Sequence, residues 1–313
     1  MRDVEIEGGW RLSDIKDIKN DKWKKELRDL LIASLNAYST GQAKYWEEIS
    51  NYYLNIAPHS LYKYYSDTLR NLSTVINNYM WYSAPSCFND AFDSDFKVDE
   101  KSIFQFYFNY FGMSRKIRVG SDEWKKLRIV TTQEIKLFRN ELENLRHTTG
   151  ISCLSESCDS NLMWAHYANS NRGMCVEYNL FEITKQLQFT PVPVIYSAEG
   201  ACLKSIDPEN ADIEAIRFLI STVSSKSEDW AYEKEWRIIR DNGACGDAWD
   251  SQKHGALLPM IEPSSIILGC KAEGDFEKQV REYCESHKIN LFKMEQDHES
   301  FRLVKQPLLH FDA

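Results

Sequence analysis

The chain has 313 residues, of which 43% are hydrophobic, 27% charged and 13% aromatic, with only 13 glycines and 8 prolines. This composition is typical of a folded globular protein and excludes a disordered or collagen-like chain. The chain has 38 Lys and Arg residues and 47 Asp and Glu residues, so its formal net charge is -9. A general attraction to the phosphate backbone of nucleic acids is therefore not expected.

The sequence carries no signal for membranes or metals. No window approaches the ~20 apolar residues that span a bilayer, and the amino terminus lacks the apolar core of a signal peptide. We therefore expect a cytoplasmic protein without a membrane partner. No C-x-x-C pair is present and the P-loop, G-x-G-x-x-G, G-x-S-x-G and H-E-x-x-H motifs are absent, so we expect no metal cofactor and none of the commonest nucleotide or hydrolase signatures.

Two helices are predicted at the amino-terminal end of the chain. Apolar residues at helical spacing indicate one helix over 13–38, a turn at 39–41, and a second helix over 45–57 that Pro58 ends. We interpret residues 1–57 as an amino-terminal helical extension, a helical hairpin that precedes the main domain.

From Ser60 onward, short strand-like segments alternate irregularly with helices. The strand candidates, rich in aromatic and β-branched residues, are 60–66, 79–83, 150–155, 173–179, 191–197, 235–240, 264–270, 289–294 and 300–304. The helical candidates among them are 67–78, 121–146, 161–168, 211–224 and 275–286.

The irregular order of these elements predicts the fold class. A regular βα alternation would favour a doubly wound parallel sheet, whereas this pattern favours an α+β fold with a mixed, largely antiparallel sheet. We expect residues 58–313 to form this α+β core domain, with the aromatic segment 102–111 and the helix after it forming a helical insertion at about 100–148.

The densest cluster of unusual residues lies between 151 and 178. On the predicted helix 161–168, Trp164 and Tyr167 are three residues apart and give one aromatic face, while His166 lies on a neighbouring face. Such a helix either holds a planar ring or is a core helix with a satisfied histidine. Arg172 follows in a turn and supplies a cation.

A second cluster lies in the segment WAYEKEWRII. If this segment is extended, Glu233, Glu235 and Arg237 share one face, because side chains alternate along a strand. Charges on one face of a strand are either exposed to solvent or form a site in which one glutamate tunes the other.

A third cluster joins the segments LYKYYS and FNDAFD. Lys63 and Tyr65 share one face of the first segment, while Asn89, Asp90 and Asp93 lie in a loop where they either cap a turn or contact a ligand. A cation beside the end of a helix or strand is a common way to hold a pyrophosphate.

These motifs together resemble a widespread bacterial family of domains of unknown function. The family's hallmarks are a YKY start, an FNDPFD-like loop, a W-x-HYA-x-x-x-x-G segment and an E-x-EWR segment. The resemblance extends over about residues 62–269, and Ala91 stands where the family usually has proline.

A more distant resemblance is to mono-ADP-ribosyltransferases of the arginine–serine–glutamate kind. Those enzymes present, in chain order, a cation on a first strand, a serine–threonine–serine strand and an E-x-E pair. Here Lys63 replaces the usual arginine or histidine, only the outer serines Ser152 and Ser155 remain, and Glu233 and Glu235 form the pair.

This resemblance implies a fold, a substrate and residue roles. It implies an ADP-ribosyltransferase-like sheet and an enzyme that consumes NAD, as an ADP-ribosyltransferase or an NAD glycohydrolase, in a toxin-like or anti-phage role. Glu235 would stabilise the oxocarbenium-like ribose, Glu233 would orient or deprotonate the acceptor, and His166 is the alternative base. The residues expected to bind the dinucleotide are Lys63, Tyr65, Ser152, Ser155, Trp164, Tyr167 and Arg172.

Two other functions remain open at this stage. The same cleft would serve a nucleotide-sensing or protein-interaction module of a bacterial defence system that binds without turnover. A metal-dependent nuclease using Asp90, Asp93 and the glutamates is a third alternative, although no recognised metal spacing supports it. For the enzyme, the acceptor would be water, a protein or a nucleic acid.

Overall fold

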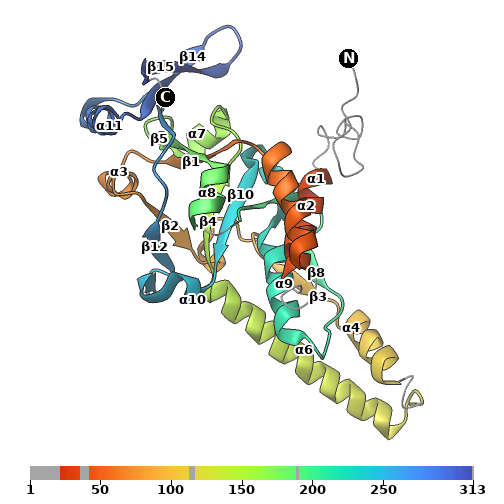
Figure 1. Ribbon diagram of the computed structural model, residues 1–313. Coiled ribbons are helices and arrows are strands. Elements are labelled where there is room, and N and C mark those ends of the chain that lie inside the picture. Colours follow the sequence, from red (N-terminus) through yellow and green to blue (C-terminus); the bar gives the residue numbers. More distant parts are fainter. Residues whose placement is uncertain (1–21, 36–41, 113–116, 188–189, 312–313) are drawn as a thin grey trace, which may run out of the picture.

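The computed structural model describes residues 22–35, 42–112, 117–187 and 190–311 (Figure 1). Residues 1–21 and 36–41, which include the predicted beginning and end of the first helix and the turn after it, lie outside the described residues. Among the described helices, none combines the length and the apolar character that crossing a lipid bilayer requires.

An 11-stranded sheet forms the centre of the fold. All of its strand pairs are antiparallel except β13–β14, so the predicted α+β class with a mixed, largely antiparallel sheet is confirmed. In spatial order the main path comprises β11 (Trp249–Asp250), β12 (Gly255–Pro259), β2 (Tyr79–Ser83), β4 (Gly150–Ser155), β1 (Ser60–Tyr65), β5 (Met174–Asn179), β13 (Ser265–Leu268), β14 (Asn290–Asp297) and β15 (Arg302–Leu309). Off this path, β10 (Glu235–Arg240) pairs with β4 and with β6 (Val192–Pro193).

Strand β4 is the branch point of the sheet. One edge of β4 pairs with β10 along its whole length, from Gly150 to Ser155. The other edge meets β1 only at Ser155, opposite Tyr62, and β2 only at Ile151, opposite Ser83. Strands β1 and β2 therefore diverge along this edge of β4. Cys153 lies between the two points at which they pair with β4.

The two faces of the sheet carry different helices. One face packs with α1 (Lys22–Ser34), α2 (Gln42–Asn55), α3 (Leu69–Ile76), α8 (Leu180–Leu187) and α11 (Gly274–His287) around the largest core cluster. The other face carries two smaller clusters: α7 (Asn161–Tyr167) covers β1 and β5, while α4 (Glu100–Tyr107), α6 (Asp122–Thr148) and α9 (Ala211–Val223) cover β4 and β10. The cavity described below lies where these two smaller clusters meet.

Helices α1 and α2 lie within the residues predicted as a helical hairpin, and α4 and α6 lie within those predicted as a helical insertion. Helices α1 and α2 pack against each other, and Leu27, Leu31 and Ile49 join the largest core cluster together with Trp236. Lys24 of α1 forms an ion pair of 2.7 Å with Glu156. Figure 1 shows α4 and α6 extending away from the strands as an arm.

Smaller elements complete the chain. They are η2 (Pro85–Cys87), β3 (Phe96–Val98), η3 (Phe108–Gly112), β7 (Ile195–Ser197), β8 (Ala201–Leu203), β9 (Ser225–Ser227), η4 (Glu228–Glu233), α10 (Asn242–Cys245) and η5 (Gly246–Ala248). The predicted strand 191–197 is divided into β6 and β7 at Val194, while β12 and α8 were not predicted at all.

Candidate functional site

A cavity of about 230 Å³ lies between β1, β4, β10, α7 and the loop before β3. Charged and aromatic side chains from these separate elements converge on it. Its lining comprises Tyr62, Lys63, Tyr64, Phe88, Asn89, Asp93, Cys153, Leu154, Ser155, Met163, Tyr167, Lys226, Glu233, Glu235 and Arg237.

Glu235 and Arg237 on β10 follow the predicted alternation of side chains, but they are buried. Glu235 and Arg237 share one face of β10, opposite Ser155 and Cys153 of β4. Glu233 ends η4, and Lys234 has a φ of 45°, a left-handed conformation that turns the chain into β10. Glu233, Glu235 and Arg237 are only 3%, 5% and 0% exposed, so the interpretation of these charges as a solvent-exposed face is wrong.

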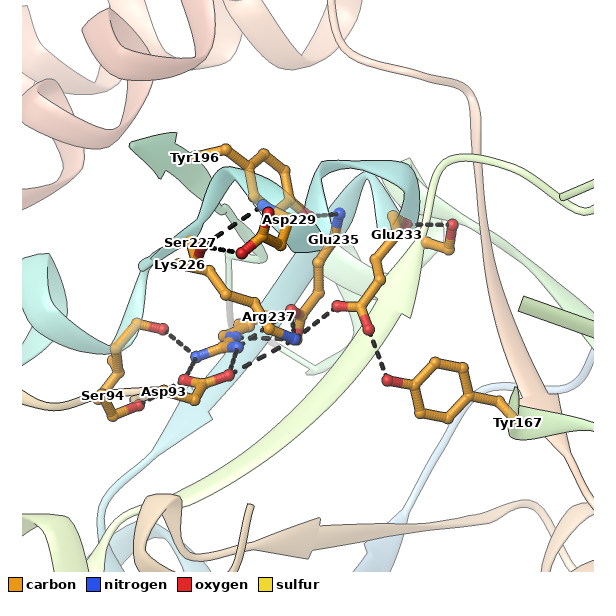
Figure 2. Close-up of polar contacts among 12 residues, drawn as sticks. Asp93, Ser94, Tyr167, Tyr196, Lys226, Ser227, Asp229, Glu233, Glu235 and Arg237 are labelled. Carbon is orange, nitrogen blue, oxygen red and sulfur yellow. Dashed lines mark hydrogen bonds and ion pairs between the residues drawn. The ribbon is translucent and has the colours of Figure 1, made fainter. Parts of the chain in front are cut away.

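Arg237 lies at the centre of the charged network (Figure 2). Its Nε and Nη2 donate to Oε1 and Oε2 of Glu235 at 2.8 and 3.0 Å. Its Nη1 and Nη2 donate to Oδ1 and Oδ2 of Asp93 at 2.8 and 2.6 Å, and Nη1 also donates to the Val223 carbonyl. One buried guanidinium thus connects β10, the loop before β3 and the end of α9.

Lys226 is the second cation of the network. Its ammonium lies 2.6 Å from Glu233 Oε2, 3.4 Å from Glu235 Oε2 and 3.6 Å from Asp93 Oδ2. Three carboxylates therefore face these two cations. Lys63, described below, lines the same cavity as a third cation, so the charges balance when all six groups are ionised.

The two glutamates have pKa values displaced in opposite directions. Burial pushes the pKa of Glu235 upward, but the charges of Arg237 and Lys226 outweigh it and lower the pKa to about 2. For Glu233, burial and the charge of Glu235 raise the pKa, and Lys226 offsets only part of that rise. Glu235 thus stays ionised, whereas Glu233 exchanges its proton at a higher pH than an ordinary glutamate.

Lys63 supplies a third cation, and the branching of the sheet explains its position. Its Nζ donates to the Cys153 carbonyl at 2.9 Å, at the point on β4 where β1 and β2 separate. Burial lowers the pKa of Lys63. Among the described residues, no carboxylate lies within ion-pair distance of this ammonium, and the charge of Glu235 partly offsets the effect of burial on its pKa.

Hydrogen bonds hold Glu233 and Glu235 in place. The Tyr167 hydroxyl donates to Glu233 Oε1, and the Ser155 hydroxyl donates to the Glu233 backbone carbonyl at 2.6 Å. The backbone N–H of Glu235 donates to the Tyr196 hydroxyl at 2.8 Å. Three hydroxyls thus position the two glutamates, and of the three only that of Tyr167 contacts a carboxylate oxygen.

The structure brings five of the predicted site residues together at the cavity. These are Lys63, Ser155, Tyr167, Glu233 and Glu235.

Three other predicted residues lie inside the protein, away from the cavity. Ser152 lies opposite Ile238 on the other face of β4. Trp164 is fully buried, donates from Nε1 to the Cys158 carbonyl and packs edge-on against Tyr64, as expected of a core helix. Tyr65 belongs to the largest core cluster. The Trp164 ring therefore has no face available to a ligand.

His166 and Arg172 are exposed and do not line the cavity. His166 lies on the outer side of α7, where its ring contacts those of Tyr167 and Tyr232. Arg172 lines a different hollow, together with Lys271 and Lys293. Neither side chain is placed to act on a group held between Glu233 and Glu235.

Sequence reasoning assigned no role at this site to Cys153, left open which of Lys63, Arg172 and Lys226 faces the cleft, and considered Asp93 as a turn cap, a ligand contact or a metal ligand. Asp93 instead pairs with Arg237, and Asp90 accepts the Phe92 N–H within its own turn. No group of three or more His, Cys, Asp or Glu side chains in the described part of the chain is arranged to hold a metal ion. The Cys153 thiol hydrogen-bonds to Glu235, and burial raises its pKa.

One comparison with known proteins gives a match. A family model described as a protein of unknown function (DUF2971) matches residues 163–238, a segment that includes Tyr167, Lys226, Glu233, Glu235 and Arg237. No curated protein and no solved structure matches the chain. The match relates the segment from α7 to β10, with its buried charged network, to an uncharacterised domain family.

Proposed function

We propose that the cavity is the active site of an enzyme that cleaves the bond between nicotinamide and ribose in NAD, as an ADP-ribosyltransferase or an NAD glycohydrolase. The observation that carries the proposal is the pair of buried carboxyl groups, Glu235 and Glu233, whose pKa values are shifted in opposite directions. Two titratable groups separated in this way are typical of an acid–base site.

The chemistry of this bond matches the charges in the cavity. As the bond from C1′ to nicotinamide breaks, its electron pair moves to the ring nitrogen and the ribose becomes an oxocarbenium-like cation. Ionised Glu235 stabilises this cation inside the cavity. The acceptor oxygen forms the new bond to C1′, and Glu233 accepts its proton.

Lys63 fits the remaining charged part of the substrate. Its ammonium uses one hydrogen bond on the Cys153 carbonyl, and it lines the cavity. A pyrophosphate oxygen would accept one of its remaining N–H groups in a charge-assisted hydrogen bond.

A chain with this activity would lower the NAD content of the cell that contains it. We therefore place the protein, as part of the proposal, among toxin-like or anti-phage effectors. The acceptor is water, a protein or a nucleic acid.

One observation favours a second candidate, a nucleotide-binding module without turnover. Every side-chain oxygen of Glu233 and Glu235 already accepts a hydrogen bond from Lys226, Arg237 or Tyr167. A network closed in this way also suits a site that senses a ligand through its shape and charge.

The test is incubation of the purified chain with NAD, with free nicotinamide followed by chromatography. We expect the parent to release nicotinamide and Glu233→Gln to release it about 100-fold more slowly, which is the loss typical of a missing general base. Glu228→Gln is the matched control, because Glu228 lies on the same element η4 but is exposed.

The outcomes separate the two candidates. Equal release by the parent and by Glu233→Gln contradicts the assigned role of Glu233. A rise in melting temperature with NAD but no nicotinamide from the parent supports the binding module.

A further inference from the structure

Three aromatic rings form a continuous surface beside the cavity. The Trp230 and Tyr232 ring centroids are 6.0 Å apart at 37°, and the Tyr232 and His166 centroids are 6.3 Å apart at 39°. Trp230 and Tyr232 are partly exposed and His166 is exposed. None of these three side chains belongs to the hydrogen-bonded charged network, and none of them lines the cavity.

Each of the three residues is linked, by chain adjacency or by a contact, to a residue that lines the cavity. Tyr232 precedes Glu233 in the chain, and the His166 ring contacts that of Tyr167, with 6.4 Å between the centroids. Both residues therefore adjoin the pair joined by the Tyr167–Glu233 hydrogen bond. The Trp230 ring lies 4.8 Å from the ammonium of Lys226. The aromatic surface therefore borders the cavity on the side of Glu233.

The size of the cavity indicates what the rings would contact. Sites that enclose whole drug-sized ligands measure roughly 300–1,000 Å³, whereas this cavity measures about 230 Å³. A dinucleotide that places its nicotinamide ribose beside Glu235 would extend past the edge of the cavity. Its other half ends in adenine, a neutral planar ring that stacks well on aromatic side chains.

We propose that Trp230, Tyr232 and His166 form a second subsite, at the edge of the cavity, which binds the adenine ring of NAD by stacking. The subsite rests on the proposed function for the identity of its ligand, but it is a binding site and does not depend on turnover. With this subsite, the three rings distinguish NAD, which carries adenine, from nicotinamide mononucleotide, which does not.

The test uses ADP, which contains the adenine, ribose and pyrophosphate but no bond that the enzyme would cleave. Isothermal titration of the full chain with ADP is expected to show binding that Trp230→Ala and Tyr232→Ala each weaken about tenfold, the loss that one stacking contact typically causes. Trp230→Phe retains a ring and is expected to restore most of the affinity. Tyr79→Ala is the control, because the Tyr79 ring is 38% exposed on β2 and does not line the cavity.

A second readout is the selectivity between substrates. The ratio of kcat/KM for NAD to that for nicotinamide mononucleotide is expected to fall about tenfold in Trp230→Ala and Tyr232→Ala. A ratio unchanged in both variants would overturn the subsite.

The binding results distinguish failure of the subsite from failure of the proposed function. If the parent binds ADP through these rings but releases no nicotinamide, the subsite stands and NAD cleavage is contradicted. If nicotinamide is released while the alanine variants bind ADP as tightly as the parent, the subsite is overturned and the cleavage stands. A parent that does not bind ADP overturns the subsite directly.

Discussion

At the scale of single residues, the site depends on how two neighbouring glutamates are paired. Glu235 lies between Arg237 and Lys226, which keep its charge. Glu233 shares Lys226 but receives its other hydrogen bond from the neutral hydroxyl of Tyr167. Two glutamates that lie two positions apart therefore differ in pKa, which is lowered for Glu235 and raised for Glu233.

This pairing predicts how the stability of the protein depends on pH. The pKa of Glu235 falls from 4.5 to about 2 on folding, so its ion pairs contribute stability that is fully present above about pH 4.5 and is lost as the pH falls through about 2. We expect the free energy of unfolding, measured by urea denaturation at several pH values, to fall less steeply in Glu235→Gln over this interval. The exposed Glu228→Gln variant should follow the parent, and a parental slope in Glu235→Gln would contradict the assignment.

The alternation of side chains along a strand placed Glu235 and Arg237 on one face from sequence alone. That the face is buried could not be predicted, because it is covered by Asp93, which is 144 residues away from Arg237 in the chain. Helical spacing likewise identified the aromatic face of α7. It did not show that the sheet covers Trp164, because the strands of the sheet come from distant parts of the chain.

At the scale of elements, the loop before β3 acts as a wall of the site. It contributes Phe88, Asn89 and Asp93 to the cavity, and the bidentate contact between Asp93 and Arg237 fastens it to β10. Both partners are buried, with exposed side-chain fractions of 0% for Arg237 and 3% for Asp93. Neutralising Asp93 would leave Arg237 with Glu235 as its remaining carboxylate partner and would release the loop from β10.

Asp93→Asn is therefore expected to destabilise the protein by about 2 kcal/mol, because the buried Arg237 loses one of its two carboxylate partners and with it a charge-assisted hydrogen bond. Urea denaturation measures this loss. Asp95→Asn removes an exposed carboxylate from the same loop and should change stability little. An Asp93→Asn protein as stable as the parent would show that the loop is held by other contacts.

Some elements could not be predicted from local sequence. The segment GALLP of β12 begins with glycine and ends with proline, which usually mark turns. In the sheet, Gly255 is needed because a Cβ at this position would lie 2.4 Å from the Tyr82 carbonyl oxygen and from the Trp81 ring. The branching of β4 likewise depends on pairing between distant strands, so the placement of Lys63 at the Cys153 carbonyl was beyond sequence reasoning.

At the scale of the whole molecule, the site lies at the boundary between two packed regions on one face of the sheet. The cluster under α7 supplies Tyr64 and Met163, and the cluster under α6 and α9 borders Cys153 and Phe88. On the opposite face, α1 and α2 contribute to the core that contains Trp236 of β10. Packing on both faces thus fixes the strand that carries Glu235 and Arg237.

The most direct test of the central claim is the rate of nicotinamide release from NAD as a function of pH. Because Glu233 must lose its proton to act as a base, and burial raises its pKa above 4.5, we predict that the rate rises with pH through a value above 4.5. We also predict that Glu233→Gln loses this rise. No release by the parent at any pH, or the same pH dependence in Glu233→Gln, would contradict the account.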